Sequence, residues 1–116
     1  MSFLFTVLSL LLAAVAAFSA VADFKGMPNI VELMKRLGYR PGFERMLGIV
    51  KLVGAAGLLI GLFEHFVGVA AALGFTAYFA LAARAHRTVD DPMTETAPAL
   101  ALTAASFLAF IAGLAS

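Results

Sequence analysis

The feature that most constrains this chain is its long stretches without any charged side chain. Residues 1–22 carry no charge, and the last 21 residues, after Glu95, carry none either. Twenty apolar residues in a helix extend about 30 Å, the thickness of the hydrocarbon core of a bilayer. The chain is 63% hydrophobic and 13% charged, and a soluble domain of this size cannot bury so much apolar surface. The sequence therefore predicts an integral membrane protein.

Two further apolar segments lie between these two, so we expect an all-α polytopic membrane protein with a four-transmembrane-helix bundle. Residues 1–22 lack the basic start and the short apolar run of a signal peptide, which favours a membrane helix there. The Asp91-Pro92 pair is expected to begin the last helix. A single domain over residues 1–116 is predicted, with spans at about 2–22, 43–63, 66–84 and 95–115.

A short amphipathic helix is expected between the first two spans, at about residues 29–37. Asn29 and Glu32 have the spacing of a capping box, and Gly38 is a suitable helix end. One face would carry only apolar side chains, those of Ile30, Leu33, Met34 and Leu37. Such a helix is predicted to lie at the membrane interface or over the mouth of the bundle.

The basic residues predict the orientation. Of the eight Lys and Arg residues, five lie in the loop between the first two spans and two in the loop between the last two. Because cytoplasmic loops are enriched in these residues, both loops are expected in the cytoplasm and both termini outside, in the plasma or inner membrane. Topology explains this charge, so nucleic-acid binding is not expected.

Small residues recur at helical spacing and predict close helix packing. Gly57 and Gly61 form a GxxxG motif, and Gly68 and Ala72 repeat the spacing in the next span. We interpret them as contacts within one chain, although a homo-oligomer stays open. The lipid bilayer and other membrane proteins are the expected partners.

The order of several short pieces resembles the DoxX-like family of small four-helix membrane proteins. The pieces are Phe18-Ser-Ala-Val-Ala-Asp-Phe-Lys-Gly-Met-Pro, Leu37-Gly-Tyr, Leu47-Gly-Ile-Val-Lys-Leu-Val-Gly-Ala-Ala-Gly-Leu-Leu and Ala83-Arg-Ala-His86. The resemblance covers roughly residues 18–100 and implies a four-helix fold. It also implies a link to membrane redox systems, such as quinone-linked oxidoreductases, or to the assembly of membrane proteins.

Lys51 is the most informative single residue, because it lies inside an apolar span. It follows Arg45 by six residues, which puts it about 9 Å deeper along a helix. Lys51 shares a helical face with Glu44, and an intramembrane charge is by default a functional candidate. The functional hypothesis is a contact with a quinone carbonyl, a lipid headgroup or an anionic substrate. The structural alternatives are snorkelling to the interface or an ion pair with Glu44 or Glu32.

The remaining candidates are weaker. Tyr78 in the third span is a candidate to face a quinone, and His86 between two arginines is a candidate headgroup contact. His65 and His86 are 21 residues apart on one predicted helix, hence about 31 Å. One monomer therefore cannot hold a haem or metal between them. The chain has no cysteine, which removes thiolate sites, so no metal site and no cofactor bound by this chain alone is expected.

Three functions stay open at this point. The first is an accessory subunit of a membrane-bound, quinone-linked oxidoreductase complex, with the redox centres on partners. The second is a non-enzymatic assembly factor, chaperone or scaffold for membrane complexes. A small dimeric transporter is the least favoured, because such proteins need a membrane-embedded carboxylate and the predicted span cores contain none. We do not expect the chain to be an enzyme on its own.

Overall fold

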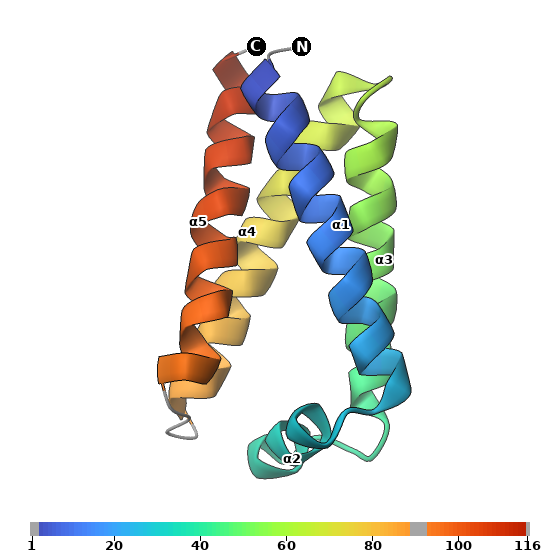
Figure 1. The fold of residues 1–116 in the computed structure, drawn as a ribbon, viewed down its shortest axis with the longest axis vertical. Helices are drawn as coiled ribbons and strands as arrows, with labels where there is room; N and C mark the ends of the chain where they lie inside the picture. Colours follow the sequence, from blue (N-terminus) through green and yellow to red (C-terminus); the bar gives the residue numbers. More distant parts are fainter. Residues whose placement is uncertain (1–2, 89–92, 116) are drawn as a thin grey trace.

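The computed structural model describes residues 3–88 and 93–115, and all of the regular structure there is helical. Two of the long helices, which end at Lys25 and Ile60, are each followed directly by a glycine. The short second helix lies across one end of the bundle formed by the other four (Figure 1). The five helices are α1 (Phe3–Lys25), α2 (Pro28–Leu37), α3 (Phe43–Ile60), α4 (His65–Thr88) and α5 (Met93–Ala115).

Within residues 3–88 and 93–115, three helices are long and apolar enough to cross a membrane: α1, α4 and the Thr96–Ala115 part of α5. The fourth predicted span, α3, does not reach this standard. It ends at Ile60, where Gly61 and Leu62 turn the chain through bonds to Gly57 and Leu59 carbonyls, and its 18 residues include Glu44, Arg45 and Lys51. Membrane-spanning helices are thus present, but α3 is shorter and more polar than expected.

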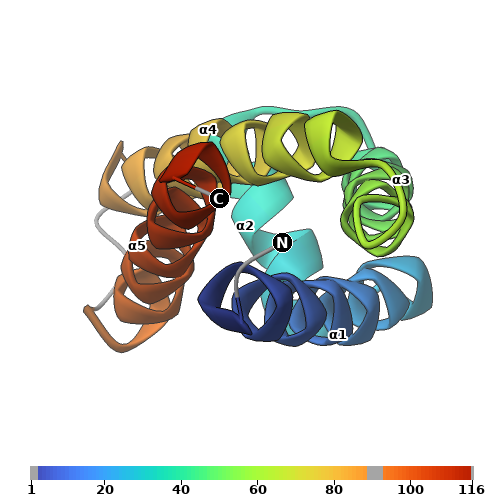
Figure 2. The same cartoon turned by 90° about the horizontal axis from the view of Figure 1, so that it is seen from above.

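The helices pack as two pairs, α1 with α3 and α4 with α5, which Figure 2 shows from above. Both termini and the α3–α4 turn lie at one end, and α2 lies at the other (Figure 1). The core between the pairs consists of small and aromatic side chains, among them Leu12, Ala16, Leu58, Phe75 and Phe79. Small residues allow this close approach where lipid provides no hydrophobic drive for association.

The glycines of α3 form the contact with α4. Gly61 meets the backbone of Gly68 so closely that an added Cβ atom would overlap it, and Gly57 lies against Ala71. The ring of Phe75 fills the space beside Gly54. The GxxxG glycines therefore pack helices of the same chain, as interpreted from the sequence.

The helix ends differ from the predictions in two informative places. α1 continues to Lys25, three residues beyond the expected end, so Asp23 is helical. α2 begins at Pro28 with Met27 as its N-cap and no side-chain cap. Asn29 is therefore the second helical residue rather than the N-cap, because the proline starts the helix one residue earlier. Gly38 does end α2, in the left-handed conformation expected of it. The expected Asp91-Pro92 helix start lies outside the described residues.

Candidate ligand-binding site

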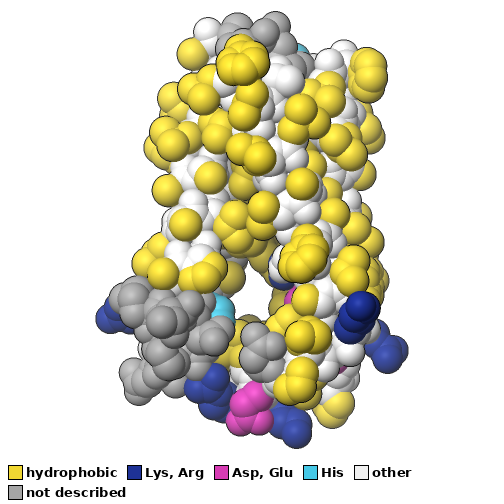
Figure 3. Space-filling model, in the orientation of Figure 1, with side chains coloured by type: hydrophobic (Ala, Val, Ile, Leu, Met, Phe, Trp, Pro, Cys, Tyr) yellow, Lys and Arg dark blue, Asp and Glu magenta, His cyan; other side chains and the backbone are white. Residues whose placement is uncertain are grey.

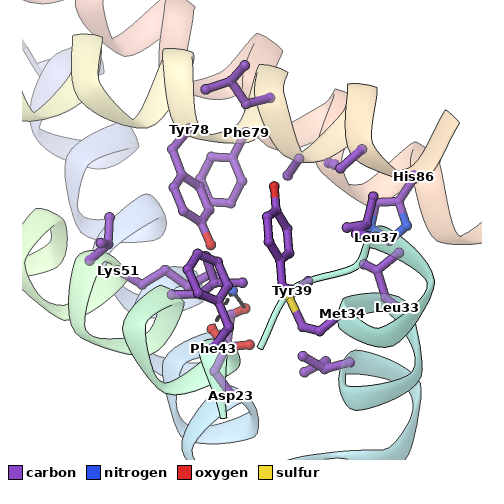
Figure 4. A pocket seen from close by; sticks show the side chains of 18 of the residues that line it. Asp23, Leu33, Met34, Leu37, Tyr39, Phe43, Lys51, Tyr78, Phe79 and His86 are labelled. Atoms are coloured by element: carbon purple, nitrogen blue, oxygen red, sulfur yellow. Dashed lines mark hydrogen bonds and ion pairs between the residues drawn. The ribbon is translucent and has the colours of Figure 1, made fainter. Parts of the chain in front are cut away.

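A cavity of about 860 Å³ lies between the two helix pairs at the α2 end of the bundle (Figure 4). Its walls are mainly apolar, and all five helices contribute to them. The α2 helix and the connection after it close the end away from the termini, with the side chains of Leu33, Met34, Leu37 and Tyr39. A cavity of this size falls in the range of small-molecule sites.

The polar part of the wall is centred on Lys51 of α3. Its ammonium group donates a hydrogen bond to Asp23 Oδ2 at 2.8 Å, which is also an ion pair, and a second to Ser19 Oγ at 2.7 Å. Asp23 is 1% exposed and Lys51 8%. Both partners come from α1, so the ammonium group is held between two helices well away from bulk solvent.

A close approach of α1 to α3 makes this pairing geometrically feasible. Gly48, one turn before Lys51, lies beneath the ring of Phe24, and a Cβ atom there would come within 3.0 Å of that ring. A Cβ atom at position 48 would require the Phe24 ring to shift slightly. The glycine therefore leaves room for this ring, next to Asp23, against α3.

Tyr78 approaches the same ammonium group from α4. Lys51 Nζ lies 5.7 Å from the centroid of the Tyr78 ring, within the range of a cation–π interaction. Phe79 packs edge-on against Tyr78, with ring centroids 5.3 Å apart. In Figure 4 the Tyr78 hydroxyl points toward the Asp23–Lys51 pair. The Tyr78 ring is therefore in contact with the Lys51 ammonium group and with the Phe79 ring.

Tyr39, in the connection after α2, supplies a further polar group to the cavity wall. It stacks on Phe43 with centroids 4.5 Å apart, and its hydroxyl points into the cavity in Figure 4. The sequence pattern gave no reason to select it, because Tyr39 lies just after a helix end, where an aromatic residue reads as an interfacial anchor.

The four predicted site residues do not all lie together. Lys51, Tyr78 and His86 line the cavity, whereas Glu44 lies outside it. Glu44 is 8% exposed and borders a separate space of about 280 Å³ between α2 and the start of α3. The structure thus groups three of these residues around one space and separates the fourth.

The ion-pair alternative for Lys51 named the wrong partners. It named Glu44 or Glu32, but the partner is Asp23. The sequence contains a signal for this: Asp23 is an acidic residue directly after an uncharged stretch. Continuing α1 by one turn would have placed it inside the bundle.

The arrangement has the chemistry of a binding site for a polar group in an apolar space. An ammonium group and two tyrosine hydroxyls can donate hydrogen bonds to a carbonyl or ether oxygen. Within residues 3–88 and 93–115, no group of three or more His, Cys, Asp or Glu side chains is placed to hold a metal ion. His65 and His86 lie near opposite ends of α4, so one chain does not bring them to a shared ligand.

A model of the DoxX-like family matches residues 7–112, which is nearly the whole chain. No curated protein and no solved structure matches this chain. The family match extends beyond the region of the motifs on which the resemblance was based, into the last helix. The chain therefore belongs to the DoxX-like family.

Proposed function

We propose that this DoxX-like membrane protein binds a lipid-soluble molecule with a hydrogen-bond-accepting head, of the quinone class, in the cavity beside Lys51. In this proposal it acts as an accessory subunit of a membrane oxidoreductase complex whose redox centres belong to partner proteins. The observation that carries the proposal is the position of a buried ammonium group, held by Asp23 and Ser19, in the wall of a mainly apolar cavity.

The proposal includes four membrane spans, with α3 as the fourth. α3 packs along α1 and α4, which are both long enough to cross the bilayer (Figure 2). The charges near its start fall at the α2 end, where the Lys and Arg side chains gather in Figure 3. This end is proposed to face the cytoplasm. The cavity then lies in the cytoplasmic half of the membrane.

The polar part of the cavity wall suits a ligand carbonyl better than a charged ligand group. Lys51 is already paired with Asp23 at 2.8 Å, so a ligand does not have to neutralise it. One ammonium proton and the hydroxyls of Tyr78 and Tyr39 can still be offered to an acceptor. The apolar walls favour a ring or chain that partitions into lipid. These requirements together fit a quinone head.

The ion pair changes the argument against the transporter alternative. The structure places a carboxylate, Asp23, inside the bundle, which the predicted span cores had lacked. That carboxylate accepts a hydrogen bond from the Lys51 ammonium group, which also donates one to Ser19. Exchange of protons for a cationic substrate requires a carboxylate that can lose its partner. The scaffold function remains the main competitor of the proposal.

The test is quinone retention by the purified protein. The full chain is purified in mild detergent, loaded with a decyl-tailed benzoquinone, and the retained quinone is extracted and quantified. Tyr78→Phe and the double variant Asp23→Asn/Lys51→Met are expected to retain much less. The double variant is used because it removes both charges together. Lys25→Met, an exposed lysine at the end of α1, is the matched control and should retain quinone normally.

Two results would contradict the proposal in different ways. Equal retention by the two cavity variants and the control would mean that the cavity is not the site. No retention by any of them, together with a varied set of membrane proteins in a pull-down from native membranes, would favour the scaffold function. A fixed dehydrogenase or cytochrome partner in that pull-down, with flavin or haem absorption, would support the accessory role.

A further inference from the structure

The two helix pairs touch at one end of the bundle and separate toward the other. At the end that holds the termini, Phe5 of α1 lies against Gly113 of α5, so closely that an added Cβ atom would come within 2.9 Å of its ring. Toward α2, α1 and α5 separate (Figure 1), and the surface has an opening between them in Figure 3. The cavity is therefore not sealed on this side.

On the opposite side of the bundle, contacts between α3 and α4 continue farther toward the α2 end. Gly61 meets Gly68, Gly57 meets Ala71, and Gly54 holds the ring of Phe75. These contacts follow one another along α3 as far as the turn above Lys51. The same side then continues with the contact between Lys51 and the Tyr78 ring. The helices thus stay together down to the polar group and separate only beyond it, toward α2 (Figure 1).

The two sides also differ in how much of the cavity wall they supply. On the α1–α5 side, α1 contributes Ser19 and Asp23, and α5 contributes Pro98, Ala99 and Leu102. Among the described residues, α3 and α4 together contribute eleven lining side chains, including Phe43, Tyr78 and Phe79. The wall on the α1–α5 side therefore consists of fewer side chains than the wall on the α3–α4 side.

The charges around the cavity cancel. Among the described residues, its lining contains two acidic side chains, Asp23 and Glu32, and two basic ones, Arg36 and Lys51. Burying a net charge in an apolar space is costly unless it is paired. A neutral head group therefore fits this lining better than an anionic or cationic one.

We propose that the ligand enters the cavity sideways from the lipid, through the opening between α1 and α5, and that its apolar tail remains in this opening. The neutral head then lies at Lys51 and Tyr78 while the tail extends past Leu102 into the surrounding bilayer. This rests on the proposed function and adds the route and the shape of the ligand. A ligand of this kind never has to cross the α2 end or pass through water.

The test uses the absence of tryptophan from the chain, because a single introduced tryptophan is then the only indole signal. Leu102→Trp places it on the α5 wall beside the proposed opening, and Leu81→Trp places it on the α4 wall. Both leucines line the cavity, so they form a matched pair. The probe is a benzoquinone with a decyl tail, with and without a bromine atom at the tail end. The difference between the two forms isolates quenching by the tail.

The bromine atom is expected to remove most of the fluorescence of Leu102→Trp and little of that of Leu81→Trp. The reverse pattern would mean that the tail leaves between α3 and α4, and would overturn the proposal. Equal or absent bromine quenching with the quinone retained would also overturn it, because the tail would then have no preferred exit. Quinone retention is measured in the same samples, so failure to bind at all is recognised separately as failure of the proposed function.

Discussion

Replacing Lys51 with methionine tests whether the ion pair is a fixed structural unit or a snorkelling lysine. Methionine keeps most of the lysine stem but removes the charge and both hydrogen bonds, to Asp23 and to Ser19. Hydrogen bonds to charged groups contribute about 1.5–3 kcal/mol each. Removing one partner of a buried ion pair costs about 3–5 kcal/mol, because the other charge is left buried and unpaired. Both estimates predict a loss of about 3–5 kcal/mol for Lys51→Met.

The double variant distinguishes the contribution of the ion pair to stability from the contributions of the two individual side chains. Asp23→Asn/Lys51→Met leaves no charge buried, and replacing a whole buried pair by neutral side chains is often close to neutral, within about 1–2 kcal/mol. The double variant should therefore be more stable than Lys51→Met alone. This non-additivity is expected only when the two side chains interact directly.

The assay is reversible unfolding in mixed micelles with increasing dodecyl sulfate, followed by far-ultraviolet circular dichroism. Lys25→Met is the control, because Lys25 is exposed at the end of the same α1 helix that carries Asp23; it should change the free energy of unfolding by no more than about 0.5 kcal/mol. If Lys51→Met were no more destabilised than Lys25→Met, the ammonium group would be at the interface in the membrane, and the reasoning about the buried pair would be refuted.

Two further predictions concern the other end of the bundle. Gly61→Ala should destabilise the protein by about 1–3 kcal/mol, because its Cβ atom would overlap the backbone of Gly68. Gly74→Ala should be neutral or stabilising, because an added Cβ atom there has nothing within 4 Å. Thermal unfolding of both variants in detergent checks this. His65→Phe should keep the edge contact with Phe5 but lose the hydrogen bond to the Gly113 carbonyl, which costs about 1 kcal/mol; an unchanged midpoint would show that this bond contributes nothing.

The membrane class and the helical fold follow from the sequence because they depend on composition and length alone. Uncharged stretches of about twenty residues have few alternatives to a membrane helix. The number of spans depends on the balance between apolar and charged residues within each helix. α3 has the right place but carries Glu44, Arg45 and Lys51 within 18 residues, so its depth in the membrane depends on what its charges contact. Hydropathy does not contain that information.

The site was only partly predictable for a related reason. Lys51 stands out in the sequence because its charge is unexpected in an apolar segment, and Tyr78 because it is polar. Their connection depends on how far α1 extends, since one additional turn brings Asp23 into the bundle 28 residues away from Lys51. Helix ends are set by local turn chemistry, here Gly26 in a positive-φ conformation followed by Pro28. The cavity itself arises from the divergence of two helix pairs, which no local pattern encodes.

The ion pair is itself an argument for binding. Apolar side chains of similar volume would pack α1 against α3 at least as well, since a buried pair is weak evidence of stability. The bundle instead places both charges at the wall of the cavity of about 860 Å³, where the Tyr78 ring lies near the ammonium group. If the pair served only to hold the helices, Asp23→Leu/Lys51→Leu should fold, associate with its partners and support their activity as the unchanged protein does. We expect this variant to fold and to associate normally but to retain much less quinone, because its cavity would lack the ammonium group that donates to the head group.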